Sequence, residues 1–330
     1  MSSYQVDPWG QIDWLMPRLG NKSWSVLLCA GSEERSVALT RWALANRLDT
    51  RQVSIARIDD QASSYSEEVT RLTDLHEEEI RRSFRIDHYN RDYILGDMSR
   101  WNEFRRNSAP GGSVILDISA MPKRVFAFLL KGLVSDPQVK DVVITYCRPE
   151  SYPEGPLSEG ASAPVSLPGF AREVESHDEV TVIVGVGFIS FDLDELLEQR
   201  YGKTISFLMP FPPASPSVRR NWKLLKKLHP PVGLEAQVKR INGMDIFEAC
   251  RWLTSASNAS NGAFDMIPLG PKPHVIAMAL AHMKIGERSQ ITYAQPTIYR
   301  PDYSLGIAST TNGKMDMLAY CLRKDGINLF

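Results

Sequence analysis

Two Pro-Lys pairs are the residues best suited to bind an anion. Pro122-Lys123 lies between an apolar segment and an amphipathic one, and Pro271-Lys272 has the same setting. Proline suits the first turn of a helix, where free N–H groups, the positive end of the helix dipole and a lysine charge together attract an anion. The predicted chemistry is therefore binding of a phosphate or a nucleotide. The alternative is that both lysines are solvated residues at helix starts.

Other loop residues extend this candidate site. Tyr152 and Tyr299 could stack on a base or cover a sheet edge, and Arg35 could contact an anion or form an ion pair at a helix start. His274 and His282 lie eight residues apart on an apolar helix, which is more typical of packed side chains than of metal ligands. The full candidate set is Ser32, Glu33, Arg35, Ser119, Met121, Lys123, Arg124, Arg148, Tyr152, Gly270, Lys272, His274 and Tyr299.

Catalysis is the alternative to binding, with Asp117, Glu150 and Asp302 as acidic groups for acid-base work. The sequence has no Walker lysine motif, no HExxH and no GxSxG. Gly185 and Gly187 form a GxG after a strand, but Ser190 stands where a dinucleotide fingerprint needs its third glycine. The four cysteines form no CxxC pair, so neither zinc nor a disulfide framework is indicated. We expect no cofactor and no metal.

Alternating apolar strands and amphipathic helices must position these loops. This alternation predicts right-handed crossovers and mainly parallel sheets. Segment 63–95 is charged and predicts helix for much of its length, whereas 153–179 is rich in Pro, Gly and Ser and predicts an irregular linker. Further strands are expected near 25–31, 51–59, 113–119, 140–152, 179–188 and 203–209, and further helices near 36–48, 98–106, 121–134, 191–201 and 217–228.

An internal repeat organises the chain. DISAMPKRVFAFLLKGL, from Asp117, aligns with MIPLGPKPHVIAMALAHM, from Met266, and ITYCRPESY aligns with ITYAQPTIY downstream. The shift is 149 residues at the Pro-Lys pairs and 147 residues at the downstream strings. We therefore predict an α/β protein with two tandem Rossmann-like lobes, residues 1–190 and 191–330, related by internal duplication. Residues 96–152 and 243–299 should be equivalent.

Charge and hydropathy limit the possible partners. A net charge of -1 gives no bulk electrostatic attraction to nucleic acid or to an anionic membrane. The first residues lack a cationic and then apolar leader pattern, and no apolar run approaches the length of a membrane span. We expect a cytoplasmic protein.

The segments DISAMPKR and IPLGPKPH resemble the ligand loops of the CRISPR-associated Rossmann-fold (CARF) group, which follow a core strand and end in lysine before a helix. Two such lobes in one chain are similar to the SAVED nucleotide sensors of bacterial antiphage systems. The resemblance implies a cyclic-oligonucleotide pocket across a pseudo-twofold axis and a separate effector subunit as partner. The first hypothesis is thus a sensor or adaptor subunit; the alternatives are an enzyme acting on a nucleotide or phosphorylated metabolite, and a scaffold subunit.

Overall fold

The computed structural model describes residues 7–59, 63–84, 86–93, 98–154, 157–173, 179–187, 204–211, 237–260 and 262–330. The chain divides into two compact units, and each is described by itself. Unit 1 comprises Met1–Gly155 and Tyr299–Phe330, and unit 2 comprises Pro156–Ile298. This division differs from the expected boundary at residue 190, because strand β9 (Val180–Gly185) belongs to the second sheet and strand β15 (Met317–Lys324) belongs to the first.

Unit 1 contains a mainly parallel sheet with the order β1-β15-β6-β5-β2-β3-β4. The parallel strands are, in sheet order, β4, β3, β2, β5 and β6. β15 lies antiparallel to β6, and β1 lies antiparallel to β15. Strand β16 pairs with β15 outside this path. The remaining bounds are β1 (Trp9–Gln11), β2 (Trp24–Ala30), β3 (Thr50–Asp59), β4 (Ile86–Tyr93), β5 (Gly112–Asp117), β6 (Val139–Cys147) and β16 (Ile327–Asn328).

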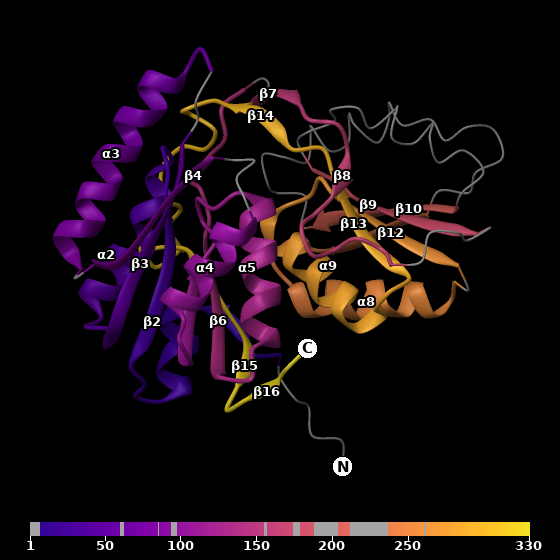
Figure 1. Ribbon diagram of the computed structural model, residues 1–330, viewed down its shortest axis with the longest axis horizontal. Coiled ribbons are helices and arrows are strands. Elements are labelled where there is room, and N and C mark those ends of the chain that lie inside the picture. The colour runs from indigo at the N-terminus through magenta and orange to yellow at the C-terminus, as the bar shows by residue number, and fades with distance from the viewer. Residues whose placement is uncertain are drawn as a thin grey trace. The chain divides into compact units, whose positions relative to one another are not determined.

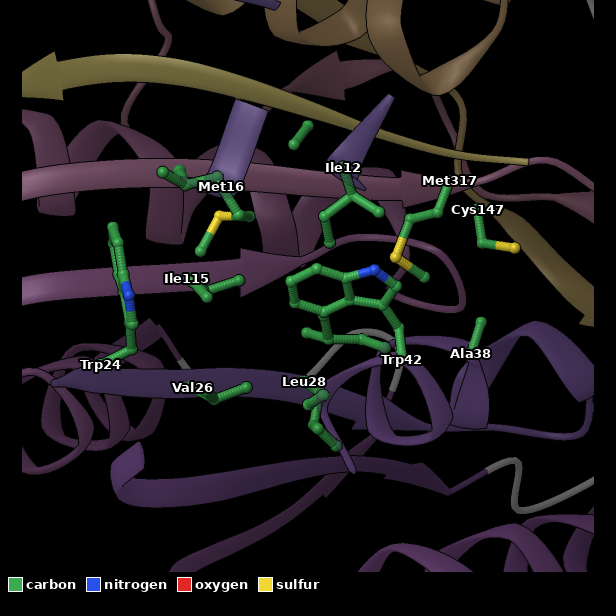
Figure 2. Packing of buried hydrophobic residues seen from close by; sticks show 14 of the residues in the cluster. Ile12, Met16, Trp24, Val26, Leu28, Ala38, Trp42, Ile115, Cys147 and Met317 are labelled. Atoms are coloured by element: carbon green, nitrogen blue, oxygen red, sulfur yellow. The ribbon is translucent and has the colours of Figure 1, made fainter. Parts of the chain in front are cut away.

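Helices cover both faces of this sheet. Every residue of β2 is buried, as expected for a central parallel strand with a helix layer on each side. On one face, Val26 and Leu28 pack with Trp42, which Figure 2 shows close to Ile12 and Met317. The helices of unit 1 are α1 (Ile12–Leu15), the 3-10 turns η1 (Met16–Leu19) and η2 (Glu34–Val37), α2 (Ala38–Ala45), α3 (Ser66–Ser83), α4 (Met98–Ser108) and α5 (Lys123–Ser135).

The opposite face of the sheet is covered by α4 and α5 (Figure 1). Leu27, which alternates with Val26 and Leu28 along β2, points to this side and is fully buried. Trp101 of α4 packs edge-to-face against Phe128 of α5, with ring centroids 5.9 Å apart. The two layers fix α5, and therefore the loop that precedes it, against the sheet.

Unit 2 contains a second mainly parallel sheet with the order β11-β10-β9-β12-β13-β8. Helix α8 begins after Asp245, whose side chain accepts a hydrogen bond from the Glu248 N–H at 2.8 Å, and α9 ends before Gly286, whose φ of 80° suits a glycine. A small separate sheet pairs β14 with β7. The bounds are β7 (Ser158–Ala161), β8 (Val165–Ser166), β10 (Thr204–Phe211), β11 (Gln237–Asn242), α8 (Ile246–Asn258), β12 (Ala263–Pro268), α9 (Lys272–Ile285), β13 (Ser289–Tyr293) and β14 (Pro296–Tyr299).

Both sheets have the same strand order. Numbered within each unit, the parallel strands follow 3-2-1-4-5, and an antiparallel strand flanks strand 5 in each case: β15 in unit 1 and β8 in unit 2. This is the order of a Rossmann-type sheet, in which strands 2 and 3 lie on one side of strand 1 and strands 4 and 5 lie on the other side. The fold prediction of an α/β chain with two Rossmann-like lobes is confirmed. Common descent by duplication stays a prediction, with which the shared order agrees.

Segment 63–95 was expected to be helical for much of its length, and α3 covers Ser66–Ser83 before the edge strand β4 follows. One expectation for secondary structure needs correction. Segment 153–179 was expected to be an irregular linker, but it contains β7 and β8. Within that segment Phe170 is fully buried and Arg172 forms an ion pair with Asp265 of β12 at 2.5 Å. The helices expected at 191–201 and 217–228 lie outside the described residues.

Candidate ligand-binding loops

In unit 1 the loop after β2 meets the loop after β5. These are the loops that flank the point where the strand order reverses, where open α/β sheets bind their ligands. A Cβ atom added at Gly31 would lie 3.3 Å from the Cβ atom of Ala120, so the two backbones approach closely. Ser32 follows Gly31 and is half-buried. The sequence correctly assigned these two loops to one loop set, because both follow parallel strands that are neighbours in the sheet.

The interior of the β5 loop is bound to the sheet. The Ser119 hydroxyl donates to Asp117 Oδ1 at 2.7 Å and accepts from the Cys147 N–H at 2.9 Å. Thr145 Oγ1 also donates to Asp117 Oδ1, at 2.9 Å. Asp117, Ser119 and Met121 are all fully buried. Their side chains therefore hold the loop in place. Because the Asp117 carboxylate is buried, it does not contact a ligand at the surface.

Lys123 and Arg124 lie at the start of α5, as predicted. Pro122 is the N-cap residue, and its carbonyl accepts from the N–H groups of Val125 and Phe126. Lys123 is half-buried. The Arg124 guanidinium lies over the Trp101 ring, 5.5 Å from its centroid, which fixes the direction of that side chain. The first turn of α5 thus carries two cations directly after the β5 loop.

Arg35 is the most deeply buried of the candidate cations. It is 1% exposed, and it donates through Nη1 to the Cys147 carbonyl and through Nε to Ser304 Oγ, both at 3.0 Å. Glu33 accepts from both Arg35 and Ser304. Burial is the largest single influence and by itself would lower the pKa of Arg35, but Glu33, Tyr146 and Tyr152 together raise that pKa. Of the two interpretations offered by the sequence, the geometry matches the ion pair at a helix start.

The remaining candidates of unit 1 are dispersed. Arg148 forms an ion pair with Asp316 at 2.8 Å, and Glu150 is exposed. Tyr299 packs edge-to-face on Tyr303, with centroids 5.6 Å apart. Burial raises the pKa of Tyr152, which lies within the electrostatic reach of Arg35. A further acidic candidate, Asp302, is paired with Arg300 at 2.9 Å. Arg148 and Asp302 are thus each held in an ion pair.

In unit 2 the corresponding loops are even closer. A Cβ atom added at Gly187 would lie 1.6 Å from the Leu269 carbonyl oxygen, so only glycine fits there. Gly270 is buried beside this contact, and Lys272 is the first residue of α9 and half-buried. His274 is fully buried, and its Nε2 donates to the Asn242 carbonyl at 3.3 Å. It is the packed histidine that the sequence favoured.

Gly187 is the equivalent of Gly31, which the sequence alone did not reveal. Cross-strand pairing aligns Leu27 with Leu116 and Ile144 in unit 1, and Ile183 with Met266 and Ile291 in unit 2. Gly31 lies four residues after Leu27, and Gly187 lies four residues after Ile183. By this register Met266 of unit 2 is equivalent to Leu116 of unit 1. The sequence alignment had matched Met266 with Asp117, which is one residue further along. The loop that leads to Lys123 is thus one residue longer than the loop that leads to Lys272.

The cysteine thiols are buried. None of the four forms a disulfide, and burial raises the pKa of Cys147 to about 12 and that of Cys321 to about 11. At pH 8 less than about one thiol in a hundred of either kind is ionised, so both are poor nucleophiles. We expect iodoacetamide to leave the native protein unlabelled over a time in which the urea-unfolded protein reacts completely. Rapid labelling of native Cys147 or Cys321 would contradict the packing described.

Among the described residues, no helix is long and apolar enough to cross a membrane, and no three His, Cys, Asp or Glu side chains are grouped to hold a metal ion. No family model and no curated protein matches the chain. Two solved structures from Pseudomonas aeruginosa are similar over 82% of the chain at 11% identity. One, from strain UCBPP-PA14, is described as a universal stress protein, with 93% of its chain covered and a TM-score of 0.25. The other, from strain PAO1, is of unknown function, with 92% covered and a TM-score of 0.23. At these TM-scores the strand order of the chain itself, and not these neighbours, defines the fold.

Proposed function

We propose that the chain is a ligand-sensing or adaptor subunit that binds a nucleotide-like anionic ligand at the loops beside Lys123 and Lys272. One observation carries the proposal. In each unit a lysine is the first residue of the helix that follows strand 4. The loop that leads to this lysine lies close to a glycine just after strand 1, through Ala120 and Gly31 in unit 1 and through Leu269 and Gly187 in unit 2. Helix N-terminal N–H groups and a lysine charge then act on the same anionic group.

Sensing is favoured over catalysis by the state of the acidic candidates. Asp117 is buried within the sheet, Asp302 is paired with Arg300, and Glu150 is exposed. A binding protein needs no acid-base residue. The biological setting that we propose, from the resemblance of the Lys123 and Lys272 loops to CARF and SAVED loops, is antiphage defence with the effector on a separate subunit.

The test is the double variant Lys123→Ala with Lys272→Ala. Each charge-assisted contact to a phosphate contributes about 1.5 kcal/mol, so the loss of its lysine should weaken binding at the loop of either unit about ten-fold. The measurement is calorimetric titration with ATP and with inorganic tripolyphosphate, together with thermal melts that should remain unchanged within about 0.5 kcal/mol.

Lys284→Ala is the matched control, because Lys284 is an exposed residue in the last turn of the same helix as Lys272. It removes the same charge far from the helix N-terminus and should leave both affinities unchanged. Equal affinities for wild type and double variant would overturn the proposed site. Recovery of a new product from ATP after long incubation would replace sensing by catalysis.

A further inference from the structure

A pocket opens beside the β2 loop of unit 1, outside the residues that the proposed function uses. Its volume is about 340 Å³, and it is lined by one side chain of β3 and five of α3: Arg57, Asp74, Glu77, Glu78, Arg81 and Arg82. Helix α3 runs along the side of unit 1 that carries β3 (Figure 1). Arg57 is 3% exposed and Glu77 is 7% exposed, so two charged groups of the pocket are built into the unit.

The pocket adjoins the candidate ligand loop. In the pairing of β2 with β3, Arg57 lies opposite Ala30, the residue before Gly31. From the helix side, His76 Nδ1 donates to the Gly31 carbonyl at 2.8 Å, and Glu77 is the next residue of α3. A ligand that contacts the Gly31 loop can therefore extend into this pocket without leaving unit 1.

The lining selects a neutral, hydroxyl-rich group. Three guanidinium groups and three carboxylates give it no net charge, so an additional anion would meet Asp74, Glu77 and Glu78, and an additional cation would meet three arginines. A hydroxyl group can both donate to a carboxylate and accept from a guanidinium. Such a lining therefore suits several adjacent hydroxyls better than it suits an ion.

Glu77 is the residue placed to accept from such hydroxyls. Its Oε2 is tied to Arg57 Nη1 at 2.8 Å, which fixes the carboxylate. Its Oε1 accepts from Arg81 at 3.3 Å, and the Arg81 side chain is 58% exposed. That longer contact, from a solvated side chain, is one that a ligand hydroxyl can replace at little cost.

We propose that this pocket binds the vicinal diol of a sugar ring, with Glu77 as the acceptor, and that the nucleotide-like ligand is therefore a ribonucleotide. This rests on the proposed function, because the phosphate end of the same ligand lies at the Gly31 and Lys123 loops. Arg57 positions Glu77 and supplies the guanidinium facing the sugar oxygens.

The experiment compares three probes on the full chain: ATP, dideoxy-ATP, whose sugar lacks both hydroxyls, and inorganic tripolyphosphate, which has no sugar. A hydrogen bond to a charged group contributes enough for about a ten-fold difference, so wild type should bind ATP about ten-fold more tightly than dideoxy-ATP. Glu77→Gln should lower the ATP affinity to that of dideoxy-ATP and leave dideoxy-ATP and tripolyphosphate unchanged. Glu68→Gln, an exposed residue in the first turn of the same helix, is the control and should change nothing.

Equal wild-type affinities for ATP and dideoxy-ATP would overturn the sugar pocket, as would a Glu77→Gln variant that weakens both equally. The wild-type comparison needs no substitution, so it decides even if the variant folds poorly. Binding of tripolyphosphate that depends on Lys123, without any preference for ATP, would reject the pocket and leave the proposed function standing. Failure of all three probes to bind at millimolar concentration would reject both.

Discussion

Replacing Arg35 with methionine is expected to destabilise unit 1 by about 3–5 kcal/mol. The side chain of Arg35 is 2% exposed and that of Glu33 is 11% exposed, so solvent screens their ion pair little. The substitution leaves the Glu33 carboxylate and the Cys147 carbonyl without the guanidinium that binds them. A buried charge without its partner is among the largest single costs in a folded protein.

Urea unfolding and amide hydrogen exchange of β2 together measure this loss, since exchange reports unit 1 even if the two units unfold separately. Arg148→Met is the control, because the Arg148 side chain is 46% exposed in its pair with Asp316 and should contribute no more than about 1 kcal/mol. Adding Glu33→Gln to Arg35→Met should restore part of the stability. Similar losses for Arg35→Met and Arg148→Met would show that the Arg35 network is not a structural element.

Most of the central strands could be predicted from local sequence. β2, β5, β6 and β12 are apolar runs bounded by turn residues, the signature of a strand buried on both faces. β4 could not be predicted in this way, because IDHYNRDY is polar and follows a charged helix without a break. The pairing of β15 with β6 could not be predicted for another reason. β6 lies about 170 residues earlier in the sequence, and no local pattern encodes so distant a pairing.

The candidate site shows the same limit. Lys123 and Lys272 were located correctly because proline and lysine at a helix start are a local signal. The burial of Arg35 depends on a contact with Ser304, which lies 269 residues later in the sequence. Ser119 is likewise buried through the Cys147 N–H on the next strand. His76, Arg57 and Glu77 were not among the sequence candidates, because a polar side chain on a charged helix or on a strand carries no local sign that it will be buried.

Replacing Gly187 with alanine should be the more severe of two matched substitutions at the strand-1 glycines. The new Cβ atom would lie 1.6 Å from the Leu269 carbonyl oxygen and 2.5 Å from its carbon, both of them backbone atoms. Relief requires the β12 loop to move as a whole, and overpacking of this kind costs about 3 kcal/mol.

Gly31→Ala makes the same chemical change at the equivalent position of unit 1, where the nearest atom is the Ala120 Cβ at 3.3 Å. That contact is tight but can relax, and alanine also restricts the unfolded chain, so we expect a net change within about 1 kcal/mol. Thermal melts of both variants, with hydrogen exchange of β9 and β12, measure the difference. If the proposed function holds, Gly187→Ala should also weaken tripolyphosphate binding through Lys272, because the displaced loop leads directly into α9. Equal and small effects of the two substitutions would instead mean that the loops of unit 2 are held less closely than Gly187 and Leu269 indicate.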